Sequence, residues 1–256
     1  MAKKKNVKPE VLSPKLFIAT PMYGGMCAGF YAQSLIDGIN KLSQAGVTTQ
    51  LSFMFNESLI PRARNALTQQ FLKSDCNYMM FIDADIKFDA NDILPMIAAD
   101  KDIICGVYPK KEIAWNMVRN AINAGVPDNE LKHHTGSFVV NLIDYNSEVT
   151  VPINQPVEIW NGGTGFMLIK RSVFDTLKKT VPVYRNDVVD LSNNLGFEEV
   201  YEFFACSIDE TRRLLSEDFH FCKIARDAGM KVWAAPWVNL SHIGTYAFEG
   251  LLTRTE

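Results

Sequence analysis

Apolar and polar positions follow two different periods over the first 110 residues. Short runs rich in apolar and β-branched side chains are separated by segments in which apolar residues recur every three or four positions. A period of two is typical of strands and a period near 3.6 is typical of helices. The short runs predict strands at Leu16–Thr20, Thr48–Phe55, Tyr78–Ile82 and Ile103–Tyr108.

Each gap between these strands holds one predicted helix. The first ends at Gly46, the second begins at Pro61, and the third runs from the capping residue Asp89 to about Ala99. Strands alternating with helices of this length predict βαβ units and a parallel sheet, in which ligands bind beyond the carboxyl ends of the strands. Three segments should therefore share that edge: Thr20–Gly25, Asp83–Asp85 and the residues after Tyr108.

The second half of the chain has a less regular pattern. Residues 112–135 indicate an insertion with a helix, and residues 136–169 indicate antiparallel strands flanking the Gly162-Gly163 bend. Further predicted elements are helices from Ser172 to about Lys179 and from Ser216 to Ala228, a strand at Lys231–Ala234, and loops over 183–212. No linker divides the chain. We therefore predict a mobile basic tail at residues 1–14 and one α/β domain at 15–250, with a mostly parallel central sheet flanked by helices and a smaller antiparallel portion.

Charge, cysteine content and hydropathy narrow the functional classes. The 256 residues carry a net charge of −3, and without the four lysines of the first nine residues the body carries 22 − 29 = −7. An acidic body disfavours nucleic acid as a partner without excluding a local basic patch. The five scattered cysteines contain no CxxC, which favours reduced thiols over disulfides or zinc. Because proline and glycine interrupt the uncharged run at 16–36, we expect no membrane span and a cytoplasmic protein.

The strongest candidate for chemistry follows the third predicted strand, where Asp83-Ala84-Asp85 comes directly after an apolar run. Residues i and i+2 of a strand face the same way, and two close carboxylates repel each other unless a cation neutralises them. A divalent metal completed by substrate phosphates is the usual solution. His242, beside Gly244, is a further candidate ligand, and an imidazole favours Mn²⁺ over Mg²⁺. In the alternative reading, the acids cap a turn and the histidine is structural.

Two other segments place charged side chains at the start of a predicted helix. Glu217 and Asp218 either complement the helix dipole or supply a general base. Arg62 and Arg64 either bind a phosphate at the helix start or form surface ion pairs.

Trp160 precedes the glycine-rich segment Gly162–Gly165. An indole can stack on a sugar, and glycines let the backbone approach a ligand closely. The alternative is a β-turn beside a core tryptophan.

Taken together, these residues resemble the GT-A-fold (Rossmann-like) glycosyltransferases, with the closest likeness to the family-2-like group of bacterial and viral enzymes. The matching segments follow the order of that superfamily: Thr20-Pro21-Met22-Tyr23, Arg64-Asn65, Asp83-Ala84-Asp85, Gly162-Gly163-Thr164-Gly165, Glu217-Asp218 and His242. The resemblance covers about residues 15–246 and implies a nucleotide-binding half at 15–111 and an acceptor half at 112–250. The implied activity is metal-dependent transfer of a sugar from a nucleotide-diphosphate sugar to a hydroxyl of a carbohydrate or other acceptor.

The resemblance also implies a role for each matching residue. Five residues would line the nucleoside pocket or lie near the donor: Thr20, Pro21, Tyr23, Arg64 and Asn65. Asp83 would face the ribose or the metal, and Asp85 and His242 would bind Mn²⁺ or Mg²⁺ directly. The acceptor would be bordered by Trp160, Gly163 and Thr164. Asp218 would be the base of an inverting displacement, with Glu217 as its neighbour or substitute.

Two other functions fit parts of the pattern. A sugar-phosphate nucleotidyltransferase shares the sheet and the acidic metal site, but it usually has a basic, glycine-rich loop after the first strand, and residues 16–36 contain no Lys or Arg. A non-catalytic carbohydrate-binding or scaffold protein has no need of four intact polar residues, Asp83, Asp85, Asp218 and His242. The loop after the first strand lacks the acid that reads uracil in many relatives, so the nucleobase stays open, as do the sugar, the acceptor and the stereochemistry.

Overall fold

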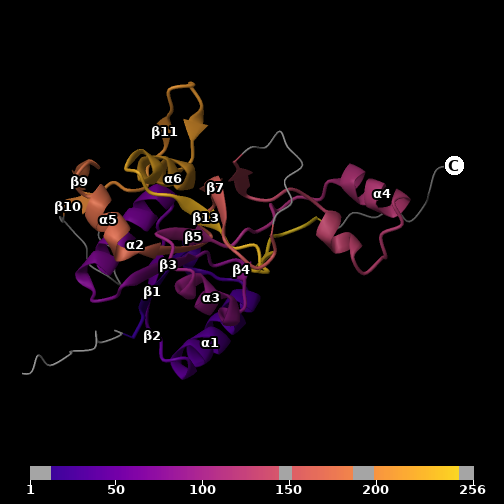
Figure 1. The fold of residues 1–256 in the computed structure, drawn as a ribbon, viewed down its shortest axis with the longest axis horizontal. Coiled ribbons are helices and arrows are strands. Elements are labelled where there is room, and N and C mark those ends of the chain that lie inside the picture. The colour runs from indigo at the N-terminus through magenta and orange to yellow at the C-terminus, as the bar shows by residue number, and fades with distance from the viewer. Residues whose placement is uncertain (1–12, 144–151, 187–198, 248–256) are drawn as a thin grey trace, which may run out of the picture.

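A central sheet with helices on both faces organises the chain in the computed structural model, which describes residues 13–143, 152–186 and 199–247 (Figure 1). Two of its eight strands, β7 and β8, run against the others, since each is antiparallel to both of its neighbours. The predicted fold class, α/β with a mostly parallel sheet flanked by helices, is confirmed. The strand order is β2 (Thr48–Phe55), β1 (Lys15–Met22), β3 (Tyr78–Ile82), β8 (Phe166–Lys170), β5 (Ile103–Cys105), β13 (Val232–Ala234), β7 (Val157–Gly162), β6 (Val140–Leu142).

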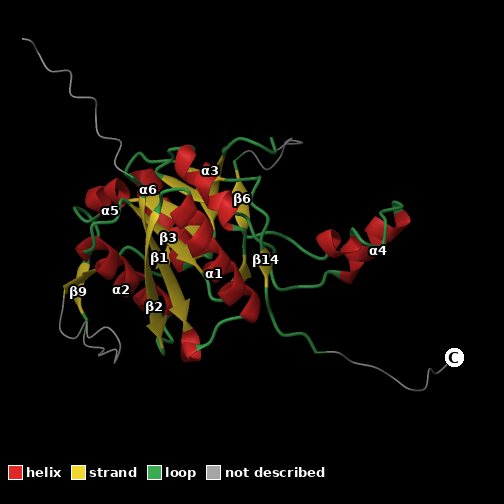
Figure 2. Ribbon diagram, turned by 90° about the horizontal axis from the view of Figure 1, so that it is seen from below, coloured by secondary structure: helices red, strands yellow, loops and turns green. Residues whose placement is uncertain are grey.

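Alternation along the strands divides the core into two layers. In β1, Phe17 and Ala19 join the core beneath one set of helices, whereas Leu16 and Ile18 join the core on the opposite face. The first face is covered by α2 (Ile60–Lys73), α5 (Arg171–Leu177) and α6 (Glu217–Asp227), and the second by α1 (Gly29–Gln44), η2 (Ala90–Asp92) and α3 (Ile93–Ala98) (Figures 1 and 2).

Smaller elements frame the carboxyl edge of the sheet. A short helix, η1 (Tyr23–Gly25), follows β1. Three two-stranded sheets pair β4 (Ile86–Lys87) with β14 (Ser241–His242), β9 (Val183–Arg185) with β10 (Glu199–Tyr201), and β11 (Ser207–Ile208) with β12 (Leu214–Leu215). The insertion predicted at 112–135 stands off the body as an arm that carries α4 (Trp115–Asn123) and η3 (Leu131–His134), as both views show (Figures 1 and 2).

Several predicted boundaries were wrong for reasons that lie in the packing. The strand predicted to reach Tyr108 ends at Cys105. The next residue is Gly106, where an added Cβ would lie 2.8 Å from side-chain atoms of Phe166 and Val238. The predicted antiparallel strands β7 and β8 exist, but β5 and β13 lie between them, so no hairpin forms.

Two further boundaries were also misplaced. β1 was predicted to end at Thr20, but it continues through Pro21 to Met22. Its pairing with β3 stops at Ala19, and beyond that point it pairs with β2 alone. Lys170, and not Ser172, precedes the first residue of α5.

The predicted basic tail and part of the predicted loops fall at residues 1–12 and 187–198, outside the described residues. Within the described ranges, no helix is both long and apolar enough to cross a bilayer.

Candidate active site

Asp83 and Asp85 lie in a tight turn between β3 and β4. The strand ends at Ile82, and the amide of Ile86 donates to the carbonyl oxygen of Asp83 at 3.1 Å. Strand alternation therefore does not set the directions of these two carboxylates, contrary to the sequence argument, and each one has its own partners. Asp83 contacts Arg64, whereas Asp85 contacts His242 and Lys111.

The structure brings Asp85 and His242 together. The pairing of β4 with β14 sets His242 opposite Ile86, and Nε2 of His242 lies 3.5 Å from Oδ1 of Asp85. On the other side of the ring, Nδ1 lies 2.9 Å from the carbonyl oxygen of Pro109, and the ring edge packs against Tyr108. Since that carbonyl can only accept, Nδ1 carries a proton, and Nε2 is the ring atom that faces Asp85.

This geometry fits a divalent cation held by two protein ligands. Metal-bound histidines commonly donate their other N–H to a carbonyl, and ions of this kind are commonly completed by substrate phosphates. Burial alone would raise the pKa of Asp85, but hydrogen bonds from His242 and Lys111 outweigh it and hold that pKa below its usual value. Within the described ranges, no group of three His, Cys, Asp or Glu side chains is arranged to hold a metal. Asp83 as a ligand therefore stays a prediction.

Lys111 is a site residue that the sequence pattern did not predict. Its ammonium group pairs with Oδ2 of Asp85, and both side chains are more than a third exposed. Gly244 makes room for its stem, because an added Cβ there would lie 2.8 Å from Cδ of Lys111. Lys111 thus neutralises part of the acidic cluster. The cluster still has a net charge of 2 − 4 = −2, counted over Arg64, Lys111, Asp83, Asp85, Glu217 and Asp218.

Arg64 is buried and ties α2 to the strand end and to α6. Its NH2 lies 3.1 and 3.2 Å from the two carboxylate oxygens of Asp83, and its Nε lies 3.1 Å from Oε1 of Glu217. Burial opposes the positive charge, but the two carboxylates outweigh it and raise the pKa of Arg64. Arg64 therefore positions Asp83 and Glu217, and its NH1 is buried with no hydrogen-bond partner among the described residues.

We expect the Arg64→Met variant to lose about 3–5 kcal/mol of unfolding free energy, because it leaves two partly buried carboxylates without their counter-charge. Urea unfolding measures this loss. Arg119→Met is the matched control, since Arg119 is exposed on α4, and its effect should stay within about 0.5 kcal/mol. Equal losses in the two variants would contradict the positioning role of Arg64.

Asp218 occupies the first turn of α6. Its Oδ1 accepts hydrogen bonds from the hydroxyl of Ser216 and, at 2.8 Å, from the amide of Phe219. Burial, reinforced by the neighbouring charge of Glu217, raises the pKa of Asp218 despite those bonds. A carboxylate with a raised pKa is a better proton acceptor near neutral pH than an ordinary aspartate.

Tyr108 is a second residue that sequence reasoning missed. It is buried, its pKa is raised by burial and next by the charge of Asp83, and its hydroxyl oxygen accepts from the amide of Gly165 at 3.1 Å. An added Cβ at Gly163 would lie 2.1 Å from that hydroxyl. The ring of Tyr108 thus occupies the space that these glycines leave open. The lack of side chains in this segment therefore does not by itself indicate a ligand. The position of Tyr108 beside Pro109, after a buried strand, is the only signal that the sequence offered.

A Gly163→Ala substitution should therefore lower the unfolding free energy by about 1–3 kcal/mol through overpacking against Tyr108. Gly29→Ala serves as its control, since a Cβ there meets nothing within 4 Å, and it should be neutral or stabilising at this helix start. Differential scanning calorimetry of the two variants tests the pair, and a stable Gly163→Ala protein would contradict the packing argument.

The residues predicted to line the nucleoside pocket differ in accessibility. Thr20 is fully buried with its hydroxyl 2.6 Å from that of Tyr31. Asn65 is also buried, and its amide group exchanges two hydrogen bonds with the backbone of Phe204, at 2.8 and 2.9 Å. Pro21 is half-buried and Tyr23 is exposed, so these two are the members of the set that a nucleoside could reach directly.

The predicted acceptor residues also differ. Trp160 is 49% exposed, and the guanidinium of Arg226 lies 4.2 Å from the centre of its ring. Thr164 is buried, and its hydroxyl has no hydrogen-bond partner among the described residues.

Comparison with known proteins gives similarity of structure only. No protein-family model matches the chain, and no curated protein is similar to it in sequence. Similar solved structures include A197 from STIV, with 16% identity over 91% of this chain and 86% of that chain and a TM-score of 0.50. GalNAc-T7 with UDP, GalNAc and Mn²⁺ has 12% identity, 92% and 44% coverage and a TM-score of 0.45. The inositol-1-phosphate CTP transferase from T. maritima has 11% identity, 90% and 88% coverage and a TM-score of 0.43.

At these identities, the likeness to A197 shows a shared fold alone, and the two weaker similarities carry no argument about activity. The architecture is consistent with the GT-A-like fold predicted from the sequence.

Proposed function

We propose that the chain is a metal-dependent glycosyltransferase that moves a sugar from a nucleotide-diphosphate sugar to an acceptor hydroxyl. The observation that carries the proposal is the approach of Asp85 and His242 at the carboxyl edge of the sheet, with Nδ1 of the imidazole tied to Pro109. The acidic surroundings and the raised pKa of Asp218 support it.

In this proposal, Asp85 and His242 hold Mn²⁺ or Mg²⁺, with Mn²⁺ favoured by the imidazole. When bound, the ion acts as a Lewis acid that stabilises negative charge on the leaving diphosphate. Asp218 accepts the proton of the acceptor hydroxyl as that oxygen attacks the anomeric carbon, which gives inversion. Arg64 holds Asp83 and Glu217 in place beside this carboxylate, and Lys111 supplies a second positive charge next to Asp85.

The first test is calorimetric titration with UDP, GDP and CDP, with and without Mn²⁺. We expect one of the three to bind in a metal-dependent manner, and Asp85→Ala to remove the dependence on metal. Asp175→Ala, at a half-exposed position on α5, is the matched control. Binding that does not respond to metal would contradict the proposed site, and the absence of any nucleotide binding would favour a scaffold protein.

A further inference from the structure

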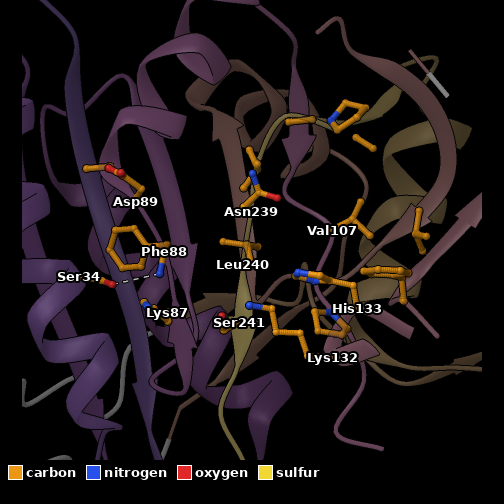
Figure 3. A pocket seen from close by; sticks show the side chains of 18 of the residues that line it. Ser34, Lys87, Phe88, Asp89, Val107, Lys132, His133, Asn239, Leu240 and Ser241 are labelled. Atoms are coloured by element: carbon orange, nitrogen blue, oxygen red, sulfur yellow. Dashed lines mark hydrogen bonds between the residues drawn. The ribbon is translucent and has the colours of Figure 1, made fainter. Parts of the chain in front are cut away.

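A cavity lies beside the candidate active site and contains none of its acidic residues. It has a volume of about 900 Å³ and opens between α1, β4, the residues before β14, and the segment that carries η3 (Figure 3). Pockets of about 300–1,000 Å³ are typical of small-molecule sites. Its size therefore suits an organic ligand and exceeds that of a packing defect.

The interior of this cavity is mainly apolar. Side chains from four separate segments contribute, among them Val107, Leu142, Val157, Val238 and Leu240. Phe138 also lines it and is half exposed, which leaves an aromatic ring in contact with water. Such a lining is stabilised when an apolar group displaces water from it.

Charged residues also line the cavity. Lys41 pairs with Asp89 at 2.8 Å, and Asp37 lies one helical turn away on α1. Lys87 and Lys132 have no carboxylate partner among the described residues, and the ammonium group of Lys87 lies 5.4 Å from the centre of the Phe30 ring.

Ser241 is a further polar residue of the cavity, and it lies directly opposite Lys87 in the β4–β14 ladder. Figure 3 shows the ammonium group of Lys132 directed toward Ser241. Two lysines and a hydroxyl thus line this mainly apolar cavity.

We propose that this cavity binds an amphipathic phosphate, a single apolar chain that ends in a phosphate group. The apolar interior takes the chain, and Lys87, Lys132 and the hydroxyl of Ser241 bind the head. A phosphate monoester carries a charge near −2 at neutral pH, which matches two lysines better than a carboxylate does. The inference goes beyond the proposed transfer reaction and does not depend on it.

The test is calorimetric titration of octyl phosphate, below its micellar concentration, into the full chain. Inorganic phosphate and 1-octanol, each of which carries only one part of that ligand, are titrated for comparison. We expect saturable binding of octyl phosphate that is at least about tenfold tighter than that of inorganic phosphate or 1-octanol. The double variant Lys87→Gln/Lys132→Gln should lose about tenfold in affinity. Lys178→Gln, on an exposed lysine just after α5, is its control and should bind as the wild type does.

A cavity-filling variant, Val157→Phe, tests the apolar part independently and should also weaken binding, provided that its melting temperature stays near that of the wild type. Vesicles of phosphatidylcholine with phosphatidic acid separate a cavity from a membrane surface. Binding to vesicles without binding of octyl phosphate would overturn the proposal, as would octyl phosphate binding that neither set of variants changes. Nucleotide titrations of the same protein report on the active site separately.

Discussion

Replacing Asp85 by asparagine is expected to lower the turnover of sugar transfer by a factor on the order of 10² to 10³. Asparagine keeps the size of the side chain but removes the charge that faces Nε2 of His242. A Lewis acid contributes several kcal/mol to a transition state, and a weakly held ion forfeits that contribution. Release of nucleotide diphosphate in the presence of Mn²⁺ measures turnover, and the paramagnetic resonance of free Mn²⁺ measures binding of the ion.

The fold should survive this substitution. The Asp85–Lys111 pair is partly exposed, and pairs of that kind contribute at most about 1 kcal/mol. Asp175→Asn changes a half-exposed aspartate of α5 that pairs with Lys178, just after the helix, and should retain full turnover. If Asp85→Asn bound Mn²⁺ as the wild type does and kept its turnover, the assignment of the metal site would be wrong.

Regular segments of the sequence predicted the first half of the fold well. Thr48–Phe55 and Tyr78–Ile82 are strands with the predicted bounds. In the helix predicted to begin at Pro61, the apolar residues that recur at helical spacing are buried, namely Ala63, Ala66, Leu67 and Phe71. These segments obey local rules, namely period, composition and a proline at the helix start, and tertiary packing agrees with those rules.

Long-range packing determines the features of the fold that local sequence patterns did not predict. Position 106, just after β5, has room only for glycine, because side chains from β8 and from the residues near Val238 occupy the space beside it. The order of strands in the second half has the same origin, since β5 and β13 enter between β7 and β8. No local period encodes either arrangement.

The candidate site likewise contains residues that local sequence patterns predicted and residues whose roles depend on long-range contacts. The turn of Asp83 and Asp85 was identified from its place after a buried strand, and His242 from its position beside Gly244. Lys111 and Tyr108 escaped notice because their roles depend on contacts across 26 and 57 positions of sequence. Arg64 stays a predicted neighbour of the donor, and the structure adds its burial between the carboxylates of Asp83 and Glu217.

The Asp218→Asn variant is expected to lose a factor on the order of 10² to 10⁴ in turnover, since it removes the proposed proton acceptor. The carboxylate must be ionised to act, so kcat/KM of the wild type should fall as the pH is lowered through the pKa of Asp218. Burial raises that pKa, so the fall should begin at a higher pH than for an ordinary aspartate. A pH profile of initial rates, taken with saturating metal, measures the position of this limb.

Ser216→Ala keeps the base and changes its pKa alone. The hydroxyl of Ser216 donates to Oδ1 of Asp218 and stabilises the ionised form, so its removal should raise the pKa further. We therefore expect the acidic limb of Ser216→Ala to move to higher pH, with a rate near the wild-type value on the alkaline side. In Asp218→Asn, the residual activity should lack this limb, because no group remains to titrate there. A limb that stays in place in both variants would assign the proton acceptor to another residue, and Glu217, held at 3.1 Å by Arg64, would be the next candidate to test.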